Sequence, residues 1–333
     1  MQKQNLLPHL IFSLVFIFTF AAQGQNPKNL LRRAQDAFGI IKHSSTLPDQ
    51  MSSEQLALGQ KLFFDPRLSA DLKVSCATCH TPQNYGTAPI SQHQGAHGVV
   101  NPRNTQSNLN LKFQHVTHWR GDRKDMLDQA VQAFTSPETF AHQSEKAAEA
   151  HLRSIGYEKD FQQSFPLEKK PLNIANAARA LVMFQESLIT PSAFDRFLEG
   201  DIKALTASQL RGMQTFMNVG CVSCHNGPAV GGKSLQRFGI TQDYWQVTGS
   251  KVQDPGRFAV TGNESDRNVF KIPSLRNVTE TKPYFHDGSA EDLKTAIRWM
   301  GILQLNTQLS SQQTEEIHAF LEALKGENPY LKN

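Results

Sequence analysis

The chain has 333 residues, of which 39% are apolar and 19% charged, so it has the composition of a globular protein and the length of about two domains. Its net charge of +4, from 34 basic and 30 acidic residues, is too small to indicate binding to nucleic acid. The four cysteines exclude a disulfide-rich scaffold, and a chain of this length needs no disulfides to hold its core.

The N-terminal 24 residues have the features of an export signal. Lys3 supplies a basic start, and a mainly apolar run of 13 residues extends from Leu10 to Ala22. This run is too short to span a bilayer but suits the core of a signal peptide, and Ala22-Gln23-Gly24 offers small residues for cleavage. The alternative is an uncleaved membrane anchor. We expect residues 1–24 to be removed and the mature protein to work in the bacterial periplasm.

The first half of the chain is predicted to be helical with one long loop. A lead-in over residues 25–50, extended or partly helical, precedes a helix that begins at the capping pattern Ser52-x-x-Gln55 and ends at Pro66. Residues 81–108 are rich in Gly, Pro, Asn, Ser and Gln, which predicts a long ordered loop. Helical periodicity then predicts helices at about residues 123–134, 144–164 and 171–189.

The second half repeats the beginning of the first at an offset of about 150 residues. Gly59-x-x-x-Phe63 precedes the first cysteine pair, and Gly212-x-x-x-Phe216 precedes the second. Further capping patterns are Thr206-x-x-Gln209 and Ser310-x-x-Gln313. A loop-rich stretch at 226–290 is followed by expected helices at about 290–300 and 311–325. Strand-like alternation is scarce, so we expect a mostly α fold.

Both cysteine pairs belong to C-x-x-C-H motifs, Cys76-Ala-Thr-Cys79-His80 and Cys221-Val-Ser-Cys224-His225. Cysteines at this spacing form thioethers with the vinyl groups of one heme, and the adjoining histidine binds its iron. A zinc site is disfavoured because cysteine and histidine are adjacent and no second pair lies about 12 to 20 residues away. A thioredoxin-like pair is disfavoured because no βαβ pattern surrounds either motif. We expect two c-type hemes with His80 and His225 as proximal ligands.

The distal ligands distinguish an electron carrier, in which both irons stay six-coordinate, from a catalyst, in which one position opens. His93 and His97 lie in the Gly-rich loop after the first motif, and either is equally explained as a surface histidine. Met300, near the end of an expected helix, is a candidate ligand of the second heme, although a methionine at such a position is more commonly part of a core. The residue pattern by itself leaves these alternatives open.

Longer motifs over about residues 50–330 carry a specific resemblance. They are Leu58-Gly-Gln-Lys-Leu-Phe-Phe-Asp-Pro-Arg-Leu-Ser69, Val74 to His80, His97-Gly98, Pro102-Arg103-Asn104, Trp119, Asp128-Gln129-Ala130, Glu138, Phe270-Lys-Ile-Pro-Ser-Leu-Arg-Asn-Val278, Pro283-Tyr-Phe-His-Asp-Gly288 and Trp299-Met-Gly-Ile-Leu-Gln-Leu305. Through them the chain resembles the bacterial di-heme cytochrome c peroxidases, the family that also includes the MauG-like enzymes. The resemblance implies two cytochrome c-like domains, residues 51–200 with the low-potential peroxidatic heme and residues 201–333 with the high-potential electron-transfer heme.

The resemblance also implies the distal ligands. His97 matches the histidine that leaves the first iron on activation, with His93 as a rival, and Met300 matches the ligand of the second iron. Because MauG-like enzymes carry tyrosine at the position of Met300, this methionine favours a peroxidase. Trp119 matches a tryptophan that lies between the hemes and aids electron transfer.

For catalysis, Glu138 matches a glutamate that acts as acid and base on peroxide, and Gln129 matches a glutamine of the same pocket. From the residues alone, Ser136-Pro137-Glu138 equally predicts a helix start with an acid in its first turn, and Gln129 on a helix would simply face solvent. An interface calcium ion is implied at Asn104 and at the backbone carbonyls around Lys271 and Pro273, since oxygen ligands suit calcium.

The implied activity is periplasmic reduction of hydrogen peroxide with electrons from a small c-type cytochrome or a copper protein (a cupredoxin), in an enzyme that is usually a homodimer. The alternatives are a MauG-like oxidase acting on a partner protein and a non-catalytic di-heme electron carrier. We expect the first heme pocket to differ from that of the family, because the chain departs from the family pattern in three places. These are Gln106 in place of a proline, His118-Trp119-Arg120-Gly121-Asp122-Arg123 in place of W-D-G-R, and Thr139 in place of a methionine.

Overall fold

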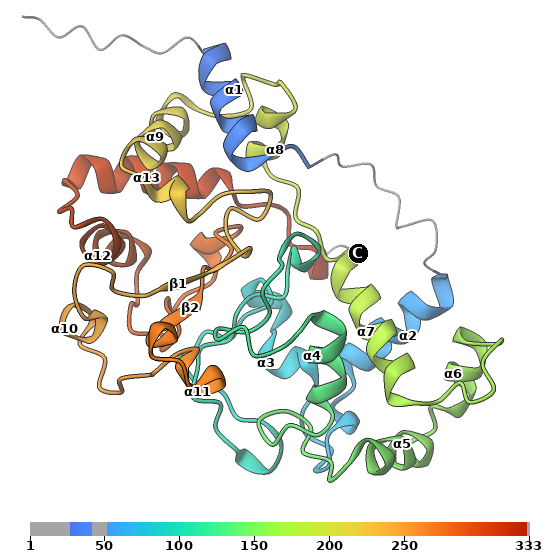
Figure 1. Ribbon diagram of the computed structural model, residues 1–333. Coiled ribbons are helices and arrows are strands. Elements are labelled where there is room, and N and C mark those ends of the chain that lie inside the picture. Colours follow the sequence, from blue (N-terminus) through green and yellow to red (C-terminus); the bar gives the residue numbers. More distant parts are fainter. Residues whose placement is uncertain (1–26, 42–51, 332–333) are drawn as a thin grey trace, which may run out of the picture.

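The computed structural model describes residues 27–41 and 52–331 (Figure 1). The predicted mostly α class is confirmed. The helices are α1 Pro27–Phe38, α2 Ser53–Phe64, α3 Cys76–Cys79, α4 Met126–Ala133, α5 Glu145–Ser154, α6 Glu158–Ser164, α7 Ile174–Ser187, α8 Ala193–Leu198, α9 Ala207–Asn218, α10 Tyr244–Thr248, α11 Phe258–Thr261, α12 Leu293–Leu305 and α13 Ser311–Ala323. Short 3-10 turns are η1 Pro66–Leu68, η2 Pro82–Asn84, η3 Ala96–Gly98, η4 Leu111–Phe113, η5 Cys221–Ser223, η6 Glu264–Asp266, η7 Val278–Glu280 and η8 Pro329–Leu331.

The strands β1 Leu235–Arg237 and β2 Val269–Lys271 pair antiparallel, with Leu235 opposite Lys271. Within the described part of the chain, no helix has both the length and the apolar character needed to cross a membrane. The expected signal peptide and its cleavage point lie outside the described residues.

The predicted helix starts form, whereas two of the predicted helix ranges differ from the observed ones. Ser52 accepts a hydrogen bond from the backbone N–H of Gln55, and the capping boxes at Thr206 and Ser310 both form. The single helix predicted at 144–164 is wrong, because Gly156 adopts a φ of +94° and separates α5 from α6. The helix predicted at about 290–300 instead runs from 293 to 305.

The first hydrophobic core lies where α2 packs against α7, with Phe63 and Phe184 in ring contact. Gly59 permits this close approach, because an added Cβ would collide with the backbone carbonyl of Ala180. The glycine and the aromatic residue four positions later therefore belong to the same helix–helix interface.

The second core repeats this arrangement at the interface of α9 and α13, where Phe216 contacts Phe320. A Cβ on Gly212 would collide with the carbonyl of Glu316. The Gly-x-x-x-Phe repeat thus has the same packing role in both halves of the chain. Figure 1 shows the two sets of helices on opposite sides of the molecule, α2 and α5–α7 on one side and α9, α12 and α13 on the other.

Two segments pack outside the half of the sequence in which they lie. The predicted lead-in contains α1, which joins the second core through Phe38, whose ring lies 5.2 Å from that of Phe194 in α8. Near the C-terminus, Tyr330 returns to the first core and stacks on Phe63 at 5.9 Å. The apolar packing therefore changes from the first core to the second between Leu188 and α8, before the predicted boundary at residues 200 and 201.

Candidate heme pockets

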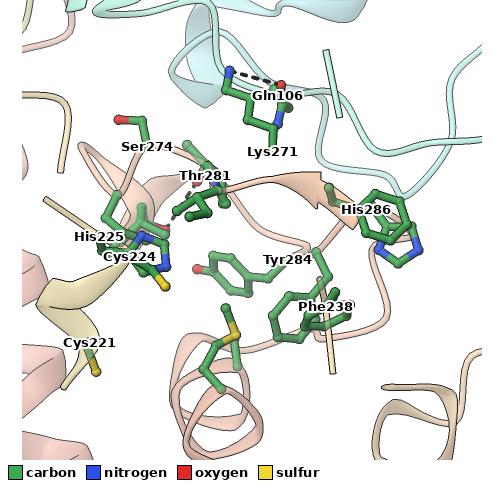
Figure 2. A pocket seen from close by; sticks show the side chains of 18 of the residues that line it. Gln106, Cys221, Cys224, His225, Phe238, Lys271, Ser274, Thr281, Tyr284 and His286 are labelled. Carbon is green, nitrogen blue, oxygen red and sulfur yellow. Dashed lines mark hydrogen bonds between the residues drawn. The ribbon is translucent and has the colours of Figure 1, made fainter. Parts of the chain in front are cut away.

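Each C-x-x-C-H motif borders its own cavity. The first, of about 550 Å³, is lined by Cys76, Cys79 and His80. The second, of about 480 Å³, is lined by Cys221, Cys224 and His225 (Figure 2). Both cavities have the size of cofactor sites, and in each one the two thiols and the imidazole face the same space. The chain therefore fits one covalently bound heme in each cavity.

The first motif is held by a single turn of helix, α3, with Ser75 and Thr78 forming a capping box. The backbone N–H of His80 donates to the carbonyl of Cys76 over 2.9 Å, which fixes the histidine beside the thiols. Its ring Nδ1 lies 3.0 Å from the carbonyl oxygen of Gly86, so Nε2 is left to bind a metal. Burial lowers the pKa of His80 and so favours the neutral imidazole that iron requires.

The second motif lies on the turn η5, where Gly220 adopts a φ of +104° just before Cys221. His225 is buried, and this burial lowers its pKa to about 4. Burial also raises the pKa of Cys221 to about 12, as it does for Cys76 and Cys79, so these thiols are not poised as zinc thiolates. Within residues 27–41 and 52–331, no group of three or more His, Cys, Asp or Glu side chains is placed to hold a metal ion.

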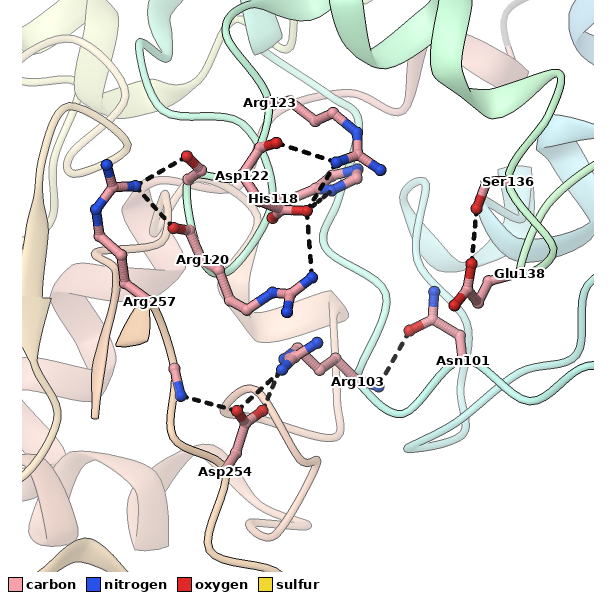
Figure 3. Close-up of polar contacts among 12 residues, drawn as sticks. Asn101, Arg103, His118, Arg120, Asp122, Arg123, Ser136, Glu138, Asp254 and Arg257 are labelled. Carbon is pink, nitrogen blue, oxygen red and sulfur yellow. Dashed lines mark hydrogen bonds and ion pairs between the residues drawn. The ribbon is translucent and has the colours of Figure 1, made fainter. Parts of the chain in front are cut away.

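The wall of the first cavity brings together three residues that the sequence suggested. Gln129 on α4, Trp119 and Glu138 all line it together with His80. Glu138 lies in a turn after α4 and does not begin a helix, and its carboxylate accepts a hydrogen bond from the Ser136 hydroxyl over 2.7 Å (Figure 3). A carboxylate, an amide and the iron-binding imidazole thus face one space.

The structure places His93, not His97, in the first cavity. The turn η3, closed by a hydrogen bond from Gly95 N to Val99 O, leaves the His97 side chain exposed at a φ of +57°. His93 is half-buried, lines the cavity, and has its Nδ1 2.7 Å from the hydroxyl oxygen of Thr105. Burial and the nearby His80 lower the pKa of His93 to about 4. In this conformation the turn directs the His97 side chain away from the cavity, and the assignment of a distal ligand stays a prediction.

The second cavity is mainly apolar. Met300 on α12 lines it, as do Phe216, Phe238 and Ile297. Figure 2 also shows Tyr284 projecting into this space between His225 and Phe238. Tyr284 was not singled out from the sequence, although it belongs to the motif Pro283 to Gly288. Burial raises its pKa to about 12, so it remains a neutral phenol.

The two cavities share a polar wall. Asn104, Gln106, Gln114, Trp119 and Lys271 line both of them. The indole N–H of Trp119 donates to the Asn104 carbonyl over 2.8 Å, and the Lys271 N–H donates to the Trp119 carbonyl over 2.7 Å. Trp119 is therefore held by its neighbours in the wall that borders both cavities.

Comparisons with known proteins identify the family of this chain. A model of the family described as Di-haem cytochrome c peroxidase matches residues 53–203. The cytochrome c551 peroxidase of Nitrosomonas europaea is 39% identical over 84% of this chain and 83% of its own length. The cytochrome c551 peroxidase of Pseudomonas aeruginosa is 39% identical over 99% of this chain and 94% of its own. The chain belongs to the di-haem cytochrome c peroxidase family.

Membership of this family makes the chain a heme-dependent oxidoreductase of the peroxidase class, and its two cysteine pairs are consistent with two c-type hemes. The fold is also shared with a solved MauG-like protein associated with microbial copper homeostasis, at a TM-score of 0.74 and 24% identity over 85% of this chain and 92% of that one.

In this peroxidase, the residues expected to bind calcium offer one free side-chain oxygen. Asn104 is buried, its amide N–H donates to the Pro283 carbonyl over 2.6 Å, and its Oδ1 has no hydrogen-bond partner within the described chain. The Lys271 side chain, which the sequence did not single out, donates to Gln114 Oε1 over 2.7 Å. Burial lowers the pKa of Lys271 to about 7.

The departures around Trp119 form a charged cluster at the first cavity. Asp122 lies 2.9 Å from Arg123, 3.3 Å from Arg120 and 3.5 Å from His118 (Figure 3). Burial alone would raise the pKa of Asp122, but His118 and the two arginines outweigh it and lower that pKa. Arg120 and Arg123 therefore place positive charge at the edge of the first cavity, with the Asp122 carboxylate between them.

Proposed function

We propose that this protein is a periplasmic di-heme cytochrome c peroxidase that reduces hydrogen peroxide to water with electrons from a small c-type cytochrome or a cupredoxin. The main support for the proposal is that Glu138, Gln129 and His80 line the same cavity. The second cavity is lined by Met300 and mainly apolar side chains. A heme iron in the first cavity would supply the peroxide-binding centre. Periplasmic location is supported by the export signal expected at residues 1–24.

Within this reaction the protein residues move protons. Each peroxide takes up two electrons and two protons and leaves as two waters, so one oxygen must lose a proton while the other gains one. The Glu138 carboxylate can accept the first proton and return it to the leaving oxygen. The Ser136 hydroxyl orients this carboxylate, and the Gln129 amide can donate a hydrogen bond to peroxide. Electrons would pass the shared wall at Trp119.

The principal test is turnover of the Glu138→Gln variant with peroxide and a reduced small cytochrome c. We expect a loss of about 10²–10⁴-fold, because the amide cannot transfer the proton. Glu199→Gln, at an exposed position outside both cavities, is the matched control. Near wild-type turnover of Glu138→Gln with both hemes loaded would contradict the assignment. A wild-type protein that carries electrons but consumes no peroxide would instead identify a di-heme carrier.

We further propose that residues 51–200 carry the low-potential heme and residues 201–333 the high-potential heme, with His225 and Met300 as ligands of the latter. The distal ligand of the first heme would come from the loop that holds His93 and His97. His93 faces the cavity, whereas His97 would have to swing inward with its turn. Spectra of the oxidised His93→Ala and His97→Ala variants separate the two, since only loss of the true ligand changes the spin state of the first heme.

A calcium ion is proposed at the wall between the cavities, where the Oδ1 of Asn104 is available, with backbone oxygens at Lys271 and Pro273 as the further ligands. Metal analysis of the purified protein should find calcium in the wild type and less in Asn104→Ala. Equal calcium in the two proteins would remove Asn104 from the ligand set. We also propose a homodimer, as is usual for the family, which light scattering at several concentrations would test.

A further inference from the structure

Lys271 places an amino group inside the wall between the two cavities. It is the last residue of β2, and its backbone N–H is tied to the Trp119 carbonyl over 2.7 Å. Only 4% of the residue is exposed, and it lines both cavities. The strand and the tryptophan thus hold its side chain at the wall that separates the two heme sites.

The amino group has only neutral partners. Nζ donates to Gln114 Oε1 over 2.7 Å and to Gln106 Oε1 over 3.4 Å (Figure 2 shows the second contact). No carboxylate in the described part of the chain forms an ion pair with it, whereas the buried Arg276 pairs with Asp195 at 2.6 Å. Buried charges in native proteins are normally paired, so this ammonium lacks an anion.

A second donor in the same wall is also unsatisfied. The Nε2 of Gln106 is buried without any hydrogen-bond partner among the described residues. Gln106 is one of the three departures from the family pattern given above. The Gln106 N–H group lacks an acceptor, and the neighbouring Lys271 ammonium has neutral acceptors but no anionic partner. Because both residues border both cavities, they point to an anionic ligand at this place.

We propose that Lys271 and Gln106 bind the propionate carboxylate of a heme at the shared wall, and that this carboxylate keeps Lys271 positively charged between the two redox centres. The inference rests on the proposed presence of one heme in each cavity. Propionate carboxylates are the anionic groups that a heme brings into such a cavity. Gln114 orients the ammonium through its 2.7 Å contact.

The charge has a consequence for electron transfer. Reduction adds an electron to a heme, and a nearby positive charge stabilises the reduced form by Coulomb attraction, strongly so in a water-poor wall. Removal of the charge should therefore lower the midpoint potential of the heme whose propionate it binds. A merely structural lysine would leave the potentials unchanged in a protein that still folds and binds heme.

The test is spectroelectrochemical titration of both hemes in Lys271→Met and Lys271→Gln, with Lys271→Arg as the charge-conserving variant. Lys294→Met is the matched control, because Lys294 is exposed on α12 and pairs with Glu315 on α13. In Met and Gln variants we expect at least one reduction equilibrium constant to fall about tenfold, which corresponds to about 59 mV for one electron. The Arg variant and the control should stay near the wild type.

The outcome of the titrations decides whether Lys271 binds a heme propionate. Unchanged potentials in heme-loaded Lys271→Met and Lys271→Gln would overturn the proposal, as would an Arg variant that behaves like Met. Loss of heme from Met and Gln but not from Arg would support it, since the charge would then be needed to hold the propionate. The titrations are made with and without excess calcium, because loss of a calcium ion from the same wall could also change a potential. A shift in potential that appears only without calcium would overturn the proposal. Heme content of the wild type, measured first, tests the proposed function separately.

Discussion

The two cavities start from the same C-x-x-C-H motif but have different walls. The first is bordered by Glu138 and His93, which can take up or release a proton, and by Gln129, whose amide can donate a hydrogen bond. The second is bordered by Phe238 and Met300 among other apolar side chains, and no Asp or Glu in the described chain lines it. Peroxide reduction needs proton transfer, whereas electron relay does not. The same motif would thus attach a heme in each cavity, while the different walls would select different chemistry.

We expect that the second cavity cannot take over catalysis even when its iron has an open position. Met300→Ala would free an iron position there, so we expect the double variant Glu138→Gln/Met300→Ala to remain about 10²–10⁴-fold below the wild type in turnover. The reason is that no carboxylate from the described residues borders this cavity to transfer the proton. Steady-state peroxide consumption measures the effect. A double variant faster than Glu138→Gln alone would show that an open iron is sufficient.

A substitution in one hydrophobic core should lower the stability of that half of the molecule more than that of the other half. Asp195 and Arg276 form an ion pair of 2.6 Å with both side chains 1% exposed, and Arg276 lines only the second cavity. Asp195→Ala leaves the guanidinium buried without this carboxylate and should lower the free energy of unfolding by about 3–5 kcal/mol.

Denaturant unfolding followed at each heme would measure this loss, and the second heme should respond first. The exposed pair of Lys61 and Asp160 provides the control, with Asp160→Ala costing about 0.2–1 kcal/mol. A loss for Asp195→Ala as small as that of the control would mean that the ion pair does not stabilise the second core.

Gly59 and Gly212 occupy the same place in the two Gly-x-x-x-Phe repeats. Gly59→Ala and Gly212→Ala should each destabilise their own half by about 1–3 kcal/mol, because a Cβ meets the carbonyl of Ala180 or of Glu316. Thermal unfolding monitored at the two hemes would distinguish them. The control is Ala207→Gly, at an exposed position in the first turn of α9. Gly200 is unsuitable as a control, because its φ of +111° disfavours alanine.

The smallest effect expected is a pH dependence confined to the first half. Burial alone would raise the pKa of Asp65, but hydrogen bonds from Arg67 and Tyr157 lower it from 3.8 to about 2. A depressed carboxyl pKa stabilises the folded state above the unfolded value, and this contribution disappears as the pH falls from 3.8 towards 2.

Because Arg67 is largely exposed, the contribution should be about 0.2–1 kcal/mol. Asp65→Asn should remove it, so that wild type and variant differ at pH 6 and converge near pH 2. Differential unfolding curves at the two pH values would check this. A difference that grows as the pH falls would contradict the sign of the effect.

The features that could be predicted from the amino-acid sequence are those set by short spacing. The two heme-attachment motifs, the N-caps at Ser52, Thr206 and Ser310, and the Gly-x-x-x-Phe repeat could all be predicted, because each acts within one or two helical turns. The family motifs added Trp119, Gln129 and Glu138, which do border one cavity. The helix predicted through Gly156 was wrong, because periodicity does not report a left-handed glycine.

Which side chains line the same cavity could not be predicted from the sequence, because it depends on packing between distant segments. His93 faces the first cavity and His97 faces solvent because of a single turn, although the two are four residues apart in the sequence. Lys271 meets Gln114, which is 157 residues away, through a strand and a loop that no local pattern relates. Side-chain direction in loops depends on the whole chain's packing, whereas attachment of a heme depends on five adjacent residues.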